Sequence, residues 1–463
     1  MKQHKKLIPT VLAIAFLAIG WQLIAMKIGF PAIFPSLIDL LKETGRLYTT
    51  DIFFIEVSVT ILRGIIGFCL AFTIAFLFAI IAAFSSFWKA FFQPLIIVSR
   101  SIPIISLVLI ALLWFSPPQL PIFIALITMF PILYQSILTG LEQTDKRLLE
   151  MSAVFGKTNI NQFIHIYLPS GKKVMYGGVK TAMGFGWRAI IMGEVLSQPV
   201  HGIGSAMKEA QIYINVSEVI AWTVVAIIIS YLFEFLIKLI QQLNIEKFLP
   251  KAQALELKII YQNIDILHIN VSNLTKYFNG REIIESYSSK FSSDKINCLK
   301  GHSGKGKTTL LRLLAGLEKS DSGEIKYSRK SNIGYSFQDV RLLPWLTVAE
   351  NIAYALNSKH LHKQEISNRV NFLLEKMELS SHVHKYPHEL SGGQQQRVGL
   401  ARSLAVQSDV LLLDEPLTGL DNELKIRIIR FLSEWFIANK PLVIWVTHEE
   451  VQIKELEVVN CEL

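Results

Sequence analysis

The chain has 463 residues, of which 51% are hydrophobic and only 18% are charged, and its mean hydropathy is +0.40. These values exclude a disordered chain and are too apolar for an ordinary soluble protein of this size. The formal charge of +9 is concentrated before residue 261, where 21 Lys and Arg face 13 Asp and Glu, against 25 and 24 in the remainder. A basic excess within an apolar region indicates membrane topology and argues against nucleic-acid binding. The three cysteines lie far apart, which excludes a disulfide framework and a zinc site.

Six apolar runs in the first 245 residues approach the roughly 20 residues that a helix needs to cross a membrane. We expect spans near 7–26, 57–84, 96–115, 120–140, 177–196 and 219–241. The third and fourth are the weakest because prolines cluster between Pro103 and Pro131, so five or seven spans remain alternatives. The first run resembles a signal peptide, but its small residues fall inside the apolar stretch, which favours a retained helix.

Orientation follows from the Lys and Arg residues of the loops, which accumulate on the cytoplasmic side. With the N-terminus inside, the inner segments carry nine such residues and the outer loops carry four. Both termini are therefore expected in the cytoplasm.

A charged residue inside or at the edge of a predicted span needs a partner, water or the interface, and three such residues are considered for a functional role. They are Arg63, Arg188 and Glu194. For the two arginines a structural role is favoured over contact with a solute, and for Glu194 both roles remain open.

A polar stretch between the fourth and fifth predicted spans has a distinctive spacing of residues. It resembles the cytoplasmic coupling loop of binding-protein-dependent importer permeases, in which Glu-Ala-Ala is followed by Gly and then by Ile-x-Leu-Pro. Met151 and Ser152 stand where that pattern has two alanines. The matching positions are Glu150, Gly156, Ile166, Leu168 and Pro169.

Most of residues 30–240 resembles the nitrate, sulfonate and taurine permeases. The similarity is carried by residues 58–63, 100–103 and 202–204. One departure is the segment 116–118, Ser-Pro-Pro, where that group has glycine-rich sequence.

The pattern changes after a mixed polar link at 251–266, and short strands then alternate with amphipathic helices. A strand at 296–300, a glycine-rich loop and a helix from Leu310 form the phosphate-binding P-loop pattern in its required context. Backbone N–H groups of such a loop hold phosphates, while its lysine reaches the β- and γ-phosphates and its threonine hydroxyl binds Mg²⁺. The expected phosphate-binding residues are Gly301, Ser303, Gly304, Gly306, Lys307, Thr308 and Thr309.

Downstream, the sequence Leu-Ser-Gly-Gly-Gln resembles the signature motif of the ABC transporter family, with Ser391, Gly392 and Gly393 as its nucleotide-contacting residues. A buried strand at 410–413 then delivers Asp414 and Glu415. The resemblance implies Asp414 as a Mg²⁺-associated residue and Glu415 as the general base.

The same resemblance assigns roles to four further positions. Gln338 would contact Mg²⁺ and the attacking water, Asp421 would lie in the loop after the carboxylates, and His448 would contact the γ-phosphate. Phe278, or Tyr277 beside it, would stack on adenine. Residues 341–348 resemble the segment that meets the permease loop.

The predicted architecture is an all-α polytopic membrane domain of about six transmembrane helices, of the type I importer permease class, followed by an α/β P-loop ABC ATPase domain. The expected boundaries are 1–250 for the permease with its coupling loop at 141–176, 251–266 for the linker and 267–463 for the ATPase. The short outer loops at 27–56 and 197–216 leave no room for a capture domain, so a separate extracytoplasmic solute-binding protein is expected.

The resemblance implies ATP-driven import of a small solute, similar to nitrate, sulfonates, taurine or thiamine precursors, across the bacterial cytoplasmic (inner) membrane. ATP and Mg²⁺ are the implied cofactors, and sharing of ATP between two subunits implies a homodimer, although pairing with another permease-ATPase chain stays open. Membrane lipid surrounds the helices and no nucleic acid is expected. An ABC exporter, or a nonhydrolytic ATP-sensing receptor or scaffold, remain the alternatives.

Overall fold

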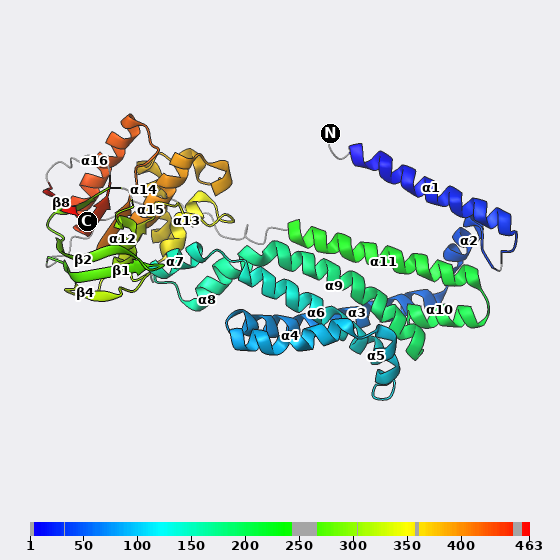
Figure 1. Ribbon diagram of the computed structural model, residues 1–463. Coiled ribbons are helices and arrows are strands. Elements are labelled where there is room, and N and C mark those ends of the chain that lie inside the picture. Colours follow the sequence, from blue (N-terminus) through cyan, green and yellow to red (C-terminus); the bar gives the residue numbers. More distant parts are fainter. Residues whose placement is uncertain (1–3, 32, 243–265, 303, 357–360, 448–455) are drawn as a thin grey trace. The chain divides into compact units, whose positions relative to one another are not determined.

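The computed structural model describes residues 4–31, 33–242, 266–302, 304–356, 361–447 and 456–463, and Figure 1 labels its helices and strands. The chain forms two compact units, one of Met1–Gln143 with Ser170–Lys247 and one of Thr144–Pro169 with Phe248–Leu463. The segment 144–169 therefore packs with the second unit, although both of its chain neighbours belong to the first. The predicted linker lies, apart from Ile266, outside the described residues.

The first unit is entirely helical in its described part. Its helices are α1 (His4–Ile28), α2 (Leu37–Tyr48), α3 (Asp51–Ala83), α4 (Ser86–Ser101), α5 (Ile104–Ala111), α6 (Leu120–Glu142), α9 (Leu168–Ser197, whose first residues belong to the other unit), α10 (Ile203–Ile212) and α11 (Val216–Gln242).

Four described helices are long and apolar enough to cross a membrane, and a bent pair makes a fifth if it is counted as one span. The four lie within α1, α3, α6 and α11, at the first, second, fourth and sixth predicted positions. The fifth predicted segment is helical as part of α9, but Lys180, Arg188 and Glu194 lower its hydropathy. The expected number of about six is thus reduced to four or five by length and composition.

The third predicted span, 96–115, does not form one continuous helix. Helix α4 ends at Ser101, α5 begins at Ile104, and their axes differ by 94°. Pro103 lacks a backbone N–H and disfavours a helical conformation in the residue before it, and Ile102 is accordingly extended at φ −70° and ψ 125°. The bend therefore has a local cause in the proline that weakened this prediction.

Small residues allow the long helices of this unit to approach closely. Along α3 the buried positions include Gly64, Gly67, Ala71 and Ala75, and a methyl group at Gly67 would collide with Ala125 of α6. Helix α9 also presents glycines to α6, because side chains at its Gly178 and Gly186 would overlap residues of that helix. Such stripes are typical of helices that pack within membranes, where close approach maximises van der Waals contact.

The second unit combines the segment 144–169 with the sheets and helices that follow residue 265. Its elements are α7 (Lys146–Val154), α8 (Asn159–Gln162), the π-helical η1 (Phe163–Tyr167), β1 (His268–Phe278), β2 (Arg281–Ser292), β3 (Ile296–Lys300), α12 (Lys307–Leu314), β4 (Ser322–Tyr327), β5 (Ile333–Ser336), α13 (Val348–Leu356), α14 (Lys363–Lys376), the 3₁₀ turns η3 (Ser380–His382) and η4 (Pro387–Glu389), α15 (Gly392–Ala405), β6 (Val410–Asp414), α16 (Asn422–Asn439), β7 (Leu442–Val446) and β8 (Val458–Glu462).

Two sheets organise this unit. A parallel sheet has the strand order β5-β6-β7-β3-β8, and an antiparallel sheet has the order β2-β1-β4. Strands β6 and β7 are buried along their whole length, as expected for a parallel sheet with both faces covered. Because the strands of a parallel sheet end at one edge, the loops after β3, β5, β6 and β7 gather there, and this edge carries most of the predicted nucleotide residues.

Candidate functional site

The glycine-rich loop after β3 adopts a conformation that glycine alone tolerates well. Gly304 and Gly306 have φ angles of +85° and +87°, in the left-handed region that side chains disfavour. A methyl group at Gly306 would also press against the backbone oxygen of Ile283. Gly306 is the N-cap of α12, so the loop leads directly into the positive end of a helix, which favours a bound phosphate.

Lys307 begins α12 and is 94% buried, since only 6% of its surface is exposed. Its Nζ donates hydrogen bonds to the carbonyl oxygens of Gly301, at 2.7 Å, and His302, at 3.0 Å. The loop therefore already holds the ammonium group above its own backbone. Thr308 and Thr309 follow in the first turn of the helix, whereas Ser303 lies outside the described residues.

Asp414 ends β6 and is only 1% exposed. Burial raises its pKa to about 6, and the hydroxyl of Thr308 acts in the opposite direction. Both carboxylate oxygens are enclosed without a hydrogen bond of normal geometry to any described residue. Two buried oxygens beside a threonine hydroxyl are ligands of the kind that Mg²⁺ prefers, so Thr308 and Asp414 fit the predicted metal.

Glu415 follows Asp414 with a φ of +47°, which turns the chain sharply at the end of the strand. Its backbone N–H donates to the Val446 oxygen on β7 at 3.1 Å, and its carbonyl accepts from the Gln396 side chain at 3.3 Å. Strain of this kind is tolerated where the surroundings hold a residue in place. Glu415 is half-buried after this turn, whereas Asp414 before it is fully buried.

Gln338 lies exposed two residues after the end of β5, the strand that pairs in parallel with β6. It therefore follows the same edge of the sheet as Asp414. The other residue predicted near the γ-phosphate, His448, follows β7 but lies outside the described residues. Tyr277 and Phe278 end β1 with 48% and 61% of their surfaces exposed, so neither ring belongs to the core.

The signature motif opens α15. Ser391 is the N-cap of this helix, and it forms a reciprocal capping box with Gln394. Gly392 and Gly393 occupy the first turn; a side chain at Gly392 would meet no atom within 4 Å, whereas one at Gly393 would contact Leu420 and Gly419. Asp421 likewise caps α16, where its carboxylate accepts from the Leu424 N–H at 2.9 Å.

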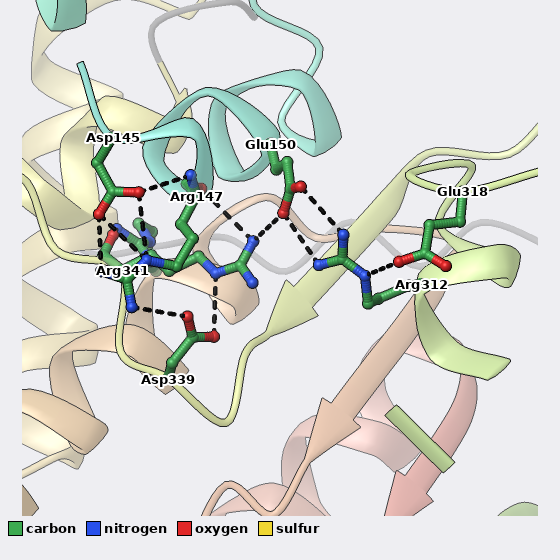
Figure 2. A network of polar contacts seen from close by, with 8 residues as sticks. Asp145, Arg147, Glu150, Arg312, Glu318, Asp339 and Arg341 are labelled. Atoms are coloured by element: carbon green, nitrogen blue, oxygen red, sulfur yellow. Dashed lines mark hydrogen bonds and ion pairs between the residues drawn. The ribbon is translucent and has the colours of Figure 1, made fainter. Parts of the chain in front are cut away.

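The segment 144–169, here called the coupling segment, docks on the ATPase through a network of ion pairs (Figure 2). Glu150 on α7 accepts two hydrogen bonds from the Arg312 guanidinium, at 2.9 and 3.0 Å, and one from Arg341 at 2.8 Å. The two arginines are anchored in turn by Glu318 and Asp339, respectively. Hydrogen bonding from Arg312, with a further contribution from Arg341, holds the pKa of Glu150 below its ordinary value.

Position makes this network significant, because Arg312 lies in the helix that Lys307 begins. Arg341 lies three residues after Gln338, in the loop that follows β5. The carboxylate of Glu150 thus joins the phosphate loop's helix and the Gln338 loop. Neither partner was expected for Glu150, although the segment 341–348 was expected to meet the permease loop.

The two residues that replace alanines in the coupling pattern make specific contacts. Met151 is completely buried in the core of the second unit. The Ser152 hydroxyl shares a 2.8 Å hydrogen bond with the hydroxyl of Tyr354 on α13. Lys157 lies over the ring of Tyr354 at 5.0 Å, and burial lowers the pKa of this lysine to about 8.

Other predicted coupling residues shape the same segment. Gly156 has a φ of +66° and ends α7, Ile166 is fully buried, and Leu168 and Pro169 begin α9. From the ATPase side, the Trp345 indole N–H donates to the His165 oxygen at 3.1 Å.

Arg402 connects the signature helix with this docking region, a link that no sequence pattern indicated. It is 1% exposed, donates to the Arg341 oxygen at 2.7 Å and lies over the Phe155 ring at 5.6 Å. Burial lowers its pKa to about 10. The helix that Ser391 caps therefore contacts both the Gln338 loop and the coupling segment.

In the first unit, the predicted charges Arg63 and Glu194 form a buried ion pair at 2.6 Å. Glu194 also accepts from the Thr60 hydroxyl at 3.0 Å and from the Gly204 N–H at 2.9 Å, while Arg63 donates to the His201 oxygen at 2.7 Å. This arrangement satisfies both charges within the protein, which agrees with the structural role favoured for Arg63 and assigns Glu194 the same role.

The loop before α10 is bound to α3 by a second carboxylate. Glu56 accepts from the backbone N–H of Gly202 and lies 2.8 Å from Nδ1 of His201. Neither Glu56 nor His201 was singled out from the sequence, because Glu56 lies just before the predicted start of its span and His201 in a loop.

The fold and these sites define a nucleotide-binding cassette joined to a polytopic permease. Residues 284–418 match the family model described as ABC transporter, and residues 75–248 match the model described as binding-protein-dependent transport system inner membrane component. The chain belongs to the ABC transporter family, with a permease domain of the binding-protein-dependent type fused ahead of its ATPase domain.

Curated relatives match the ATPase part. The sulfate/thiosulfate import ATP-binding protein CysA 1 of Agrobacterium fabrum is 37% identical over 41% of this chain and 59% of its own length. The spermidine/putrescine import ATP-binding protein PotA of Thermotoga maritima is 38% identical over 40% and 52%, respectively. The probable sulfate/thiosulfate import ATP-binding protein CysA of Chlorella vulgaris is 38% identical over 41% and 84%. The chain thus spans little more than half the length of the first two relatives.

Among solved structures, a dimeric ATP-binding cassette bound to ADP and Pi is 28% identical and covers 39% of this chain and 88% of its own, with a TM-score of 0.37. A dimeric bacterial ABC transporter cassette is also 28% identical and covers 42% and 94%, with a TM-score of 0.39.

Proposed function

We propose that this chain is half of an ATP-driven importer, in which two copies together carry a small solute across the bacterial cytoplasmic membrane. The observation that carries the proposal is the Glu150 network, because it ties the permease's cytoplasmic segment to the helix that begins with Lys307. A movement of that helix on nucleotide binding is transmitted to the permease through a charged, partly buried contact.

The residues at the sheet edge support ATP hydrolysis. Lys307 and the loop N–H groups would bind the β- and γ-phosphates, and Thr308, Gln338 and Asp414 would supply oxygen ligands for Mg²⁺. Bound Mg²⁺ would neutralise charge on the phosphates. Glu415 accepts a proton from the attacking water.

Two copies are needed because the signature motif acts on the nucleotide of the partner subunit. Ser391 and the N-terminus of α15 would complete the site that Lys307 begins in the other copy, assisted by Asp421, while His448 contacts the γ-phosphate. Phe278, exposed at the end of β1, offers a stacking surface for adenine.

The proposed solute is small and similar to nitrate, sulfonates, taurine or a related compound, and a separate extracytoplasmic protein delivers it. This proposal rests on the resemblance of the permease part. The relatives of the ATPase part do not identify the solute, because they are named for import of both sulfate and spermidine. The bias of Lys and Arg toward one set of loops supports a cytoplasmic location for both termini and the ATPase.

ATP hydrolysis by the full chain in lipid nanodiscs tests this proposal, with Glu415→Gln as the inactive control. An importer is supported if ATP turnover by the wild type disappears in the variant and rises when the solute-binding protein is added together with its solute. Turnover equal to that of the variant under all conditions would refute hydrolysis and favour a nucleotide-sensing receptor. Turnover that ignores every binding protein but drives solute outward would favour an exporter.

A further inference from the structure

Arg188 differs from Arg63, the other arginine considered within the predicted membrane spans. Arg63 is buried and paired with Glu194. Arg188 is exposed, and it forms no hydrogen bond or ion pair with any residue in the described part of the chain. The acidic group nearest to Arg188 along α9 is Glu194, whose carboxylate is already occupied.

Contacts of the neighbouring residues fix the depth of Arg188. Gly186 packs on Met129 of α6, and the Trp187 indole N–H donates to the Ala226 oxygen on α11 at 3.0 Å. Met129 lies nine residues after the start of α6, which at about 1.5 Å per residue is about 14 Å into that span. The hydrocarbon core is about 30 Å thick, so Arg188 lies near its middle.

No segment in the described part of the chain covers the face of α9 that carries Arg188. Exposed residues recur at helical intervals from Gly177 through Thr181 and Phe185 to Arg188. The opposite faces of this helix contact α3, α6 and α11, all of which are apolar spans. An unpaired charge at this depth is too costly to leave in lipid, so it requires water or an anion.

We propose that Arg188 is a charge-selecting residue of the solute pathway, where it binds the anionic group of the transported solute. This inference rests on the proposed import function and narrows its solute class to compounds that carry a negative charge, such as oxyanions or sulfonates. In the proposed homodimer, the same residue of both copies would face the pathway. Two guanidinium groups attract a small anion and repel a polyamine.

Thiol reactivity beside Arg188 provides the test, in a full chain whose native cysteines are replaced and which is embedded in nanodiscs. Gly184 lies one turn before Arg188, and a side chain added there meets no atom within 4 Å. The variant Gly184→Cys is treated with anionic sulfonatoethyl methanethiosulfonate and with its cationic trimethylammonium analogue. Both reagents should react, and the anionic one should be favoured.

Combining Gly184→Cys with Arg188→Gln should lower the ratio of the anionic to the cationic rate about tenfold, since the reagent's charge passes close to the guanidinium. Arg188→Lys keeps a positive charge and should preserve the ratio. Gly177→Cys is the matched control, because this glycine is also unobstructed but lies eleven residues away, or about 16 Å along the helix. That distance exceeds the screening length of about 8 Å at physiological salt, so Arg188→Gln should leave its ratio unchanged.

A thiol at position 184 that reacts with neither reagent would overturn the inference, because the face would then be covered. A ratio that is the same with arginine and glutamine at position 188 would overturn it as well. Neither readout requires ATP turnover. If the same nanodiscs lack ATPase activity while the charge preference is present, the proposed import function fails and the selective pathway stands.

Discussion

The substitution Glu150→Gln should loosen the coupling segment without unfolding the ATPase. It retains the shape of the side chain but removes the charge that accepts three hydrogen bonds from Arg312 and Arg341. Glu150 is 30% exposed, whereas the side chains of Arg312 and Arg341 are 19% and 8% exposed. The interaction is therefore stronger than a surface ion pair but weaker than a fully buried one.

The expected magnitude follows from what each arginine retains. Arg312 keeps its bond to Glu318 and Arg341 keeps its bond to Asp339, so neither guanidinium is left unpaired. Without that compensation, removal of one partner of a buried ion pair costs about 3–5 kcal/mol. We expect a loss of about 2 kcal/mol in docking free energy, which corresponds to about a 30-fold change in the docking equilibrium.

Hydrogen exchange of the backbone amides in residues 148–155 measures this effect. The amides of α7 should exchange up to about 30-fold faster in Glu150→Gln, and ATP turnover should become less responsive to the loaded binding protein. Glu324→Gln is the control, because its ion pair with Lys326 joins two side chains that are 59% and 69% exposed. Unchanged protection of α7 in Glu150→Gln would refute the assigned role of this carboxylate.

The pH dependence of docking has a defined sign. Because Arg312 lowers the pKa of Glu150 in the docked state, this contribution is fully present above the ordinary carboxyl pKa of 4.5 and is lost as the pH falls through the lowered value. The contribution of Glu150 to the protection of the α7 amides in the wild type should therefore be constant between pH 6 and 8, once the rates are corrected for the intrinsic pH dependence of hydrogen exchange.

Three further predictions concern other parts of the chain. Gly202→Ala should lower the melting temperature of the full chain by several degrees, corresponding to about 2 kcal/mol, because its φ is +149° and a methyl group would meet the Glu194 carboxyl; unchanged melting would contradict this packing. Burial lowers the pKa of Lys157 from 10.5 to about 8 in the folded state, so the unfolded state binds more protons between these two pH values and thermal stability should rise with pH in that interval. The variant Lys157→Met should remove this rise in melting temperature. A rise that persists in the variant would show that another group causes it. Ser391→Ala should reduce ATP turnover far more than ATP binding measured by fluorescent nucleotide titration, while the lost cap costs about 1 kcal/mol; equal losses in both would indicate a structural role alone.

Local patterns predicted the strands and the helix whose ends carry the expected nucleotide residues. The strand expected at 296–300 is β3, and the buried strand that delivers Asp414 is β6. The helix after the phosphate loop was expected from Leu310; it begins at Lys307 and ends at Leu314, two residues before Gly316, whose φ is +69°. These strand and helix positions can be predicted because they depend on residue spacing and glycine content within a short stretch of sequence.

Contacts between residues far apart in the chain could not be predicted from the sequence. The bonds of Glu150 join positions 162 and 191 residues apart, and no periodicity indicates such partners. The same holds for Arg63 and Glu194, which are 131 residues apart. Hydropathy marked Arg63 and Arg188 as equivalent charges, and only the structure distinguishes the paired residue from the exposed one.

Helix continuity in the first unit was also only partly predictable. The apolar character of 96–115 favoured one span, whereas Pro103 favoured a break, and a hydropathy average does not decide between them. Helix α9 was expected as a span of 20 residues and extends over 30, because residues 168–176, which were predicted as the end of the coupling loop, belong to the same helix.

Transport into sealed proteoliposomes tests the central claim most directly. Full chains are reconstituted with ATP and Mg²⁺ on the side of the ATPase domain, and the radiolabelled solute with its binding protein is supplied on the opposite side. The account predicts accumulation against a gradient on the ATPase side, at a rate proportional to ATP turnover, and none with Glu415→Gln. Hydrolysis without accumulation, or movement of solute away from the ATPase side, would contradict import by this chain.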